Sequence, residues 1–269
     1  MSNDRLYKYL DANGGLMMLY YSTLMFTNAT QLNDPFDCHP VFRNISPNPW
    51  GPYKWFTEKE ASWVDYHERL RQREKTYICS LSKVHDSILM WSYYAKQHSG
   101  ICVGLDMEKT RKYLNRMTGL FLGCPELEVQ YRDVVNEPSS MKDPNDFLCY
   151  HFATKAKEWQ HEQEVRLIAY DPDPMHMRRL SGQYEEEPFL KKIKRMFPKK
   201  KENAYMDWKE VRAILNIGGE CFESLYLGVN MKDKDKENII KVARKCNQDI
   251  NIYQMTIAPE AFRLKEVQI

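Results

Sequence analysis

The segment of residues 159–170, WQHEQEVRLIAY, constrains the fold most strongly, because its pattern changes from helix to strand within a few residues. Phe152, Ala156 and Trp159 recur at the spacing of one helical face, which predicts a short helix. From Glu164 onward, polar and apolar side chains alternate, which predicts a strand with one buried face. The chain is therefore expected to pass from helix into strand at the sequence Glu-Gln-Glu.

Two glutamates, Glu162 and Glu164, lie at this transition, and their spacing directs both side chains to the same side. Carboxylates that share a face repel each other unless a cation, a metal ion or a substrate stands between them. The pair is therefore a candidate catalytic site. The alternative is an ordinary exposed strand start, at which Arg166 neutralises one of the glutamates.

The composition is that of a soluble globular protein, since 43% of the 269 residues are hydrophobic and 28% are charged. The net charge of +2 gives no global argument for a nucleic-acid or membrane partner. The first ten residues contain no apolar signal segment, and nowhere do 18 apolar residues follow one another. Seven widely spaced cysteines without a CxxC pair indicate reduced thiols, so we expect a cytoplasmic protein.

The remaining pattern predicts a single α+β domain over residues 1–269, with mixed or antiparallel sheets and flanking helices. Asn13-Gly-Gly15 is expected to close the first strand, and a loop is expected at 44–56. The expected strands cover residues 6–9, 19–27, 76–82, 100–106, 129–131, 224–229 and, as the final strand, 250–257. The expected helices cover residues 57–75, 87–97, 107–115, 144–160 and 234–245.

Residues 171–208 differ in character and are interpreted as a basic insertion. Within them the stretch 188–201, PFLKKIKRMFPKKK, contains seven Lys or Arg residues and no acidic residue. One interpretation is a solvated segment with a lightly packed helix. The other is a flap that contacts phosphate backbones.

The motif Asn33-Asp-Pro-Phe-Asp37 is rich in turn-forming residues. It is explained by an Asx-turn alone, because Asn and Asp side chains cap their own backbone and Pro fixes the bend. Asp34 and Asp37 are also expected to line a cleft with Asn33 and Glu164, since all lie near strand ends, where ligand sites collect. The neighbouring cysteine and histidine lack metal-ligand spacing, so we assign no metal ligand.

Hydroxyl and aromatic residues give further candidates. Ser80 and Ser82 flank the end of a strand without a G-x-S-x-G nucleophile motif, which favours hydrogen bonding to a ligand or helix capping. Trp91, Tyr93 and Tyr94 can stack on a flat ligand ring or pack in the core. No GxGxxG and no GxxxxGK[ST] motif is present, which argues against a Rossmann nucleotide site and against P-loop nucleotide hydrolysis.

Taken together, the motifs LYKY, NDPFD, S-x-S, MWSYYA with G-I-C-V-G-L-D, and W-x-x-E-x-E-V-R resemble those of an uncharacterised domain family of bacterial proteins. They stand here at residues 6–9, 26–37 (a strand ending in phenylalanine and then NDPFD), 80–82, 90–106 and 159–166. The resemblance spans most of the chain in order and spacing. It carries little settled biochemistry.

The chain also resembles, more remotely, the ADP-ribosyltransferases, which have a polar residue on the first strand, a hydroxyl ending the second and Glu-x-Glu starting a late strand. The resemblance implies that Lys8 or Tyr9 and Thr27 hold NAD. It implies that Glu164 stabilises the cation formed as nicotinamide leaves, while Glu162 activates the acceptor. The chain departs from that pattern at Lys8, where the superfamily usually has His or Arg; lysine lacks the bidentate fork of arginine.

These observations leave three hypotheses. The first is an NAD-consuming ADP-ribosyltransferase-like enzyme, such as a bacterial toxin or phage-defence effector, that modifies a protein or nucleic-acid acceptor. The second is a metal-dependent nuclease that uses the Asp and Glu residues as ligands for Mg²⁺, and the third is a non-enzymatic ligand-binding or interaction module. Under the first, Glu164 and Glu162 are catalytic, and the cofactor-binding residues are Lys8, Tyr9, Thr27, Asn33, Asp34, Ser80, Trp91 and Tyr94.

Overall fold

The computed structural model describes residues 4–39, 70, 72–116, 126–134, 150–170 and 212–269. The predicted loop at 44–56, nearly all of the predicted helix at 57–75 and the insertion at 171–208 with its basic stretch lie outside the described residues. No helix in the described ranges has both the length and the apolar character needed to cross a membrane.

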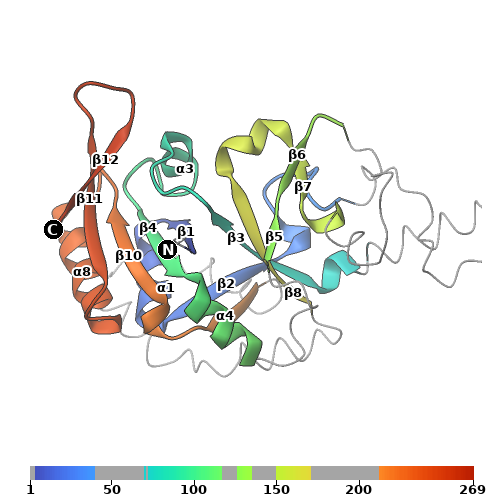
Figure 1. Cartoon of the computed structure of the whole chain (residues 1–269), viewed down its shortest axis with the longest axis horizontal. Helices are drawn as coiled ribbons and strands as arrows, with labels where there is room; N and C mark the ends of the chain where they lie inside the picture. Colours follow the sequence, from blue (N-terminus) through green and yellow to red (C-terminus); the bar gives the residue numbers. More distant parts are fainter. Residues whose placement is uncertain (1–3, 40–69, 71, 117–125, 135–149, 171–211) are drawn as a thin grey trace, which may run out of the picture.

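In the part of the chain that the structure describes, ten strands form one branched sheet (Figure 1). Its main path runs β12-β11-β10-β4-β1-β3-β2-β9, and β8 adds to β3 and carries β5. The pairs are antiparallel except for β10 with β11. These strands are β1 (Arg5–Leu10), β2 (Thr23–Asn28), β3 (Thr76–Ser82), β4 (Ile101–Asp106), β5 (Glu126–Glu128), β8 (Glu164–Tyr170), β9 (Arg212–Asn216), β10 (Phe222–Leu227), β11 (Asn251–Ile257) and β12 (Leu264–Gln268).

A second, small sheet pairs β6 (Gln130–Arg132) with β7 (Thr154–Ala156) in parallel. The α-helices of the described residues are α1 (Ala12–Tyr21), α3 (Ile88–Tyr93), α4 (Met107–Arg116) and α8 (Asp233–Cys246). Short 3₁₀ helices are η1 (Ala29–Gln31), η4 (Lys157–Glu162) and η7 (Gly219–Cys221). The mixed, mainly antiparallel sheet with flanking helices confirms the predicted α+β class.

Strand β3 is the branch point of the sheet. Along one edge it pairs with β8 over its whole length, from Thr76 opposite Tyr170 to Ser82 opposite Glu164. Along the other edge β1 is in register only at Tyr7 opposite Ser82, whereas β2 pairs further back, with Thr27 opposite Ile78. The strands β1 and β2 therefore diverge from β3 on either side of residues 79–81.

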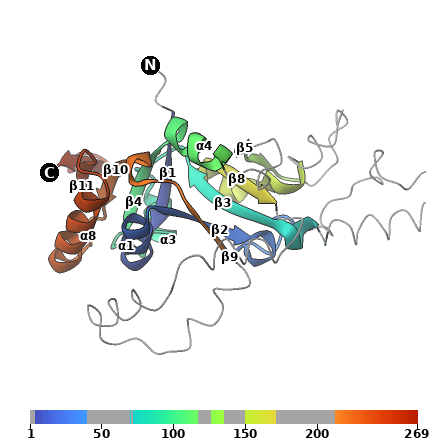
Figure 2. The same ribbon diagram turned by 90° about the horizontal axis from the view of Figure 1, so that it is seen from below.

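The larger core lies between this sheet and the helices α1 and α8, which pack side by side (Figure 2). A second cluster around Tyr9 and Trp91 packs α3 against the opposite face of β1 and β4. A third joins Ile78 and Ile168 to the residues around Ala29 and Phe152. The sheet is thus covered on both faces at its branch point.

The structure corrects the prediction for residues 12–22, where the expected start of the second strand at 19 is helical. Asp11 caps α1 by accepting a hydrogen bond from the Gly14 amide at 2.6 Å, and β2 begins only at Thr23. The two glycines disfavour a helix locally. The helix forms because its buried face, which includes Gly15 and Leu19, packs into the larger core.

The prediction of one continuous helix over 144–160 is wrong in its described part. Helical structure ends at Phe152, Ala156 lies in β7 and Trp159 lies in η4. The expected strand at residue 164 is present as β8, but both of its faces are buried rather than one. The three apolar residues therefore lie in three different elements, and their helical spacing does not reflect one helix.

Two further boundaries differ from the predicted ones. The helix expected over 87–97 ends at Tyr93, because Lys96, Gln97 and His98 all adopt positive φ. The strand expected to be the last, β11, is followed by the edge strand β12.

We predict that Gly15→Ala lowers the free energy of unfolding by about 1–3 kcal/mol through overpacking. A Cβ built on Gly15 would lie 2.1 Å from Ile101 Cδ1 on β4. Denaturant unfolding of the single variants Gly15→Ala and Ile101→Ala and of the double variant measures the effect. Because Ile101→Ala removes both Cδ1 and Cγ1, which would lie 2.1 and 2.5 Å from the new Cβ, the double variant should lose less than the sum of the two single losses. Strict additivity would contradict the close approach of α1 and β4.

Candidate functional site

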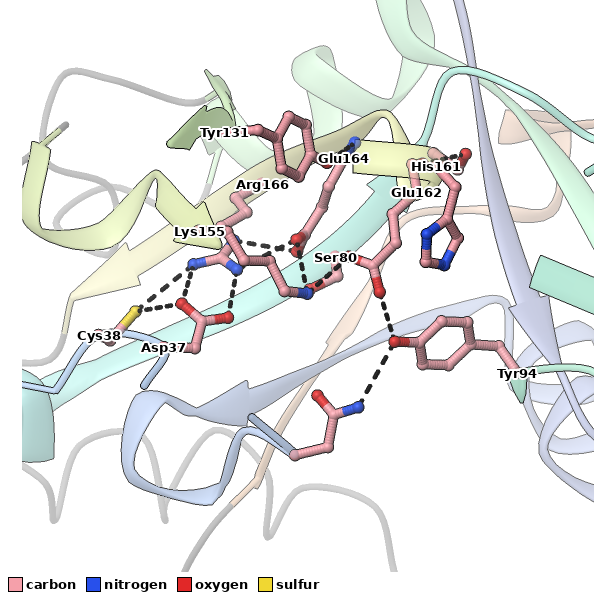
Figure 3. Close-up of polar contacts among 12 residues, drawn as sticks. Asp37, Cys38, Ser80, Tyr94, Tyr131, Lys155, His161, Glu162, Glu164 and Arg166 are labelled. Carbon is pink, nitrogen blue, oxygen red and sulfur yellow. Dashed lines mark hydrogen bonds and ion pairs between the residues drawn. The ribbon is translucent and has the colours of Figure 1, made fainter. Parts of the chain in front are cut away.

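Arg166, on β8, lies at the centre of a buried network of charged side chains (Figure 3). Its guanidinium donates two hydrogen bonds to the Asp37 carboxylate, at 2.9 and 2.5 Å, and two to Glu164, at 2.9 and 3.1 Å. A further bond of 2.7 Å reaches the carbonyl of Phe152. The N–H groups of the guanidinium thus all donate to oxygen atoms, and for this reason an arginine that is 0% exposed can stay charged.

Lys155, on β7, stands between the two glutamates. Its Nζ lies 2.5 Å from Glu162 Oε2 and 3.4 Å from Glu164 Oε2, and it sits 4.7 Å above the centre of the Trp159 ring. The cation that the spacing of the glutamates requires is therefore supplied by the chain itself. The glutamates are buried, at 3% and 4% exposure, so the strand start is not exposed, although Arg166 does pair with Glu164 as that alternative expected.

The other oxygen of Glu162 faces α3. Glu162 Oε1 accepts a hydrogen bond of 2.5 Å from the Tyr94 hydroxyl, which in turn accepts one of 3.4 Å from the Asn33 amide. Asn33 is exposed and Tyr94 is half-buried. The network therefore runs from a buried end at Asp37 to a solvent-accessible end at Asn33.

The local backbone explains how two residues separated by one position share a partner. Gln163 adopts the left-handed conformation, with φ of 44°, between η4 and β8. The turn is fixed because Ser82 Oγ donates to the Glu162 carbonyl at 2.7 Å and the Glu164 amide donates to the Tyr131 hydroxyl at 2.8 Å.

The electrostatics favour full ionisation of the buried end. Burial alone would raise the pKa of Glu164, but the charges of Arg166 and Lys155 outweigh it, and the pKa is lowered to about 2. Burial likewise opposes the charge of Lys155, yet the two glutamates raise its pKa. For Tyr94, burial and the hydrogen bond to Glu162 both raise the pKa, so the phenol stays protonated as a donor.

The neighbouring part of the site lies where β1 and β2 diverge from β3, at residues 79–81, which we call the fork. Lys8 Nζ donates a hydrogen bond of 2.8 Å to the carbonyl of Ser80, within the stretch of β3 from which β1 and β2 diverge. A hydrogen bond from the Ser80 side chain is among the interactions that lower the pKa of Glu164. Lys8, Thr27 and Ser80 are all partly exposed. The first-strand cation, the second-strand hydroxyl and the late-strand glutamate therefore surround one strand, β3.

The NDPFD motif divides its roles between its two aspartates. Asp37 reaches Arg166, whereas Asp34 forms the Asx-turn by accepting a hydrogen bond of 2.9 Å from the Phe36 amide. The second oxygen of Asp34 is buried and has no hydrogen-bond partner among the described residues. Asp34 therefore forms the predicted Asx-turn and Asp37 lies in a buried ion pair, whereas the cleft expected to hold them with Asn33 and Glu164 stays a prediction.

Trp91 and Tyr9 are placed in the core. Trp91 is 0% exposed, packs edge-to-face on Tyr9 at 5.5 Å and donates to the His85 carbonyl. Tyr9 donates its hydroxyl to the Val84 carbonyl. Both side chains fill the second core cluster, and it is Tyr94, the residue that caps the C-terminal end of α3, that joins the network.

Lys155 and Tyr131 were missed by sequence reasoning. The pattern predicts that Lys155 lies in a continuous helix over 144–160 and gives no sign that it meets the glutamates, whereas in the structure the strand β7 brings it onto them. Asp37 and Arg166 were noted, but not as partners, because 129 positions separate them in sequence.

Residues 90–167 match the model of a family described as "Protein of unknown function (DUF2971)". Over that segment, which holds Tyr94, Lys155, both glutamates and Arg166, the chain is thus similar to an uncharacterised domain family. Comparison with curated proteins gave no significant match, and comparison with solved structures gave none either.

We predict that Glu164 gives the protein a marked acid dependence of stability. Its folded-state pKa of about 2 lies below the ordinary value of 4.5, so its stabilising contribution is present above pH 4.5 and is lost as the pH falls towards 2. A shift of this size corresponds to a contribution of the order of 3 kcal/mol.

Unfolding free energies of the wild type and Glu164→Gln across this range measure the effect. The difference between them should shrink as the pH falls, whereas Glu128→Gln, at an exposed residue of β5, should leave the wild-type curve unchanged. A pH-independent difference would show that Glu164 is not ionised in the folded protein.

Proposed function

We propose that the chain is an ADP-ribosyltransferase-like enzyme that consumes NAD, with Glu164 as the fixed carboxylate of its catalytic centre. The observation that carries the proposal is the fork at β3, around which Lys8, Thr27 and Glu164 come from β1, β2 and β8. The resemblance implies such a set of cation or imidazole, hydroxyl and late glutamate, and the origin of the three residues from strands paired with or next to β3 supports it. The order of these strands in the chain also agrees with it.

The chemistry of the reaction fits the state of Glu164. When the bond between the ribose C1′ and nicotinamide breaks, its electron pair leaves on nicotinamide and positive charge develops on the ribose. A carboxylate that is already ionised and immobilised stabilises such a charge without reorganising. Arg166 and Lys155 hold Glu164 in that state, with a pKa of about 2, so it carries no proton at neutral pH.

Glu162 is assigned to the acceptor. It lies at the end of the network that leads through Tyr94 and Asn33 to solvent. In the proposed reaction the acceptor's nucleophilic atom bonds to C1′ and transfers its proton to Glu162. General base catalysis of this kind requires the carboxylate to be within hydrogen-bond reach of that proton.

The polar atoms around the fork fit a dinucleotide. The Lys8 ammonium suits a diphosphate, and the hydroxyls of Thr27 and Ser80 suit ribose or amide groups. The unpaired buried oxygen of Asp34, next to Asn33, would gain a partner from a ligand donor, because a buried acceptor left unpaired is costly.

The geometry disfavours the metal-dependent nuclease at this site. A Mg²⁺ site needs several carboxylate oxygens and waters converging on the ion. Here the space between Glu162 and Glu164 holds Lys155 Nζ, and Asp37 is bound by Arg166 on both of its oxygens. The interaction of the basic stretch 188–201 with phosphate backbones stays a prediction.

We predict that Glu164→Gln reduces the release of nicotinamide from NAD by roughly 10²–10³-fold, the range found when one preorganised electrostatic group is removed. Nicotinamide is quantified by chromatography after incubation of the full chain with NAD, with and without cell extract as a source of acceptors. Glu128→Gln serves as the matched control, since Glu128 lies opposite Val165 on the neighbouring strand but is exposed.

A folded Glu164→Gln variant with wild-type turnover would exclude the catalytic role of Glu164. A wild-type protein that releases no nicotinamide under any of these conditions would overturn the proposal, and the non-enzymatic module would then stand.

A further inference from the structure

The ammonium group of Lys155 occupies the position that a divalent cation takes in sites built from paired carboxylates. We propose that Lys155 is a positioning residue: its ammonium stands between the carboxylates of Glu162 and Glu164, offsets their mutual repulsion and keeps them turned towards each other. Where the inference concerns catalysis it rests on the function proposed above, but the state of the two carboxylates is measurable without any substrate.

Lys155 is buried and paired on more than one side, unlike a surface lysine. Its side chain is 4% exposed, and Nζ meets an oxygen of Glu162 at 2.5 Å, an oxygen of Glu164 at 3.4 Å and the face of Trp159 at 4.7 Å. Three partners on different sides match the three donors and the point charge of an ammonium group.

The position of Lys155 is fixed by the same structure that fixes Glu164. Lys155 is in register with Tyr131 in the parallel pair of β7 and β6. The Tyr131 hydroxyl accepts the hydrogen bond of the Glu164 amide. The small sheet of β6 and β7 therefore fixes the backbone at both residues, Lys155 through strand pairing and Glu164 through the Tyr131 hydroxyl.

The number of positive and negative charges around Glu162 and Glu164 shows how Lys155 affects the two carboxylates. The charged and titratable groups that face the pair from the surrounding elements are Asp37, Cys38, Tyr94, Tyr131, His161 and Arg166. With Lys155 the three carboxylates are bonded to two cations, and without it Arg166 is the only cation bonded to them among the described residues, while Lys8 stays bonded to the nearby Ser80 carbonyl. Two buried carboxylates that share a site without a cation between them retain a proton, so that one of their pKa values rises.

This has a direct consequence for the proposed reaction. A Glu162 that shares a proton with Glu164 at neutral pH no longer accepts one from an acceptor. Lys155 would thus maintain the general base without contacting the reacting atoms itself. Loss of Lys155 should reduce kcat and move the pH optimum upward, while the KM for NAD changes little.

The decisive experiment measures the melting temperature of the full chain without ligand between about pH 5 and pH 8. In Lys155→Met, one carboxylate has a folded-state pKa above its unfolded value. Its protonation therefore stabilises the folded variant at low pH, and this contribution is lost as the pH rises. The deficit of Lys155→Met relative to the wild type should accordingly grow from pH 5 to pH 8.

Two further variants control the result. Lys157→Met, two residues away and 57% exposed, should show no such growth. In Lys155→Met/Glu162→Gln the carboxylate pair no longer exists, so the double variant should melt with a deficit that does not depend on pH. If Lys155→Met alone does not fold, the double variant should fold at the same pH, because it lacks the second unpaired carboxylate; a double variant that also fails to fold would point to lost packing and overturn the inference.

A second measurement supplies a free ammonium ion in place of the Lys155 side chain. Methylammonium chloride should raise the melting temperature of Lys155→Ala in a saturable way, and more than sodium chloride of equal concentration does, because it binds only the folded state. The wild type should respond equally to both salts.

A deficit of Lys155→Met that is the same at all pH values, or equal responses of Lys155→Ala to the two salts, would reduce Lys155 to a packing role and overturn the inference. Neither measurement involves NAD. If the pH effect is present and nicotinamide is not released, the proposed function fails while the inference stands.

Discussion

The fully buried guanidinium of Arg166 is the constraint on which the rest of this site depends. It binds one carboxylate from the loop after η1, a second from its own strand and a carbonyl from the segment before β7. An arginine buried without such partners would be prohibitively costly, and breaking a buried pair typically costs about 3–5 kcal/mol. The three segments can therefore pack only in the arrangement that delivers Asp37, Glu164 and Phe152 to Arg166, and this arrangement also sets the position of Lys155.

The network has a buried end and an accessible end, and the two ends suit different tasks. At Arg166 every oxygen is compensated, which favours rigidity. At Tyr94 and Asn33 the same chain of hydrogen bonds reaches solvent, which favours exchange with a ligand. A structural ion network needs only the first end. The fork at β3, where Lys8 meets the Ser80 carbonyl, adds polar groups that the packing alone does not require.

The sequence allowed the carboxylate pair, the strand that carries Glu164 and the α+β class to be predicted, because alternation and carboxylate repulsion are local properties. It did not allow the fold around them to be predicted. Helix α1 was missed because burial of Leu16 and Leu19 outweighs the low helix propensity of two glycines. Lys155 was missed because tertiary packing turned an expected helix into β7. Which aspartate of NDPFD would meet Arg166 depended on the turn that Asp34 forms, and no local pattern distinguishes the two.

We propose that the fork and the ion network together form a dinucleotide site, and an equilibrium titration tests this most directly. Melting temperature is followed as NAD is added to the wild type, to Lys8→Met and to Lys83→Met, an exposed lysine paired with Glu128. A ligand that binds only the folded state raises the melting temperature with its concentration. The account predicts such a rise for the wild type and Lys83→Met and a weaker one for Lys8→Met. No response of the wild type to NAD, or an equal response of all three proteins, would contradict it.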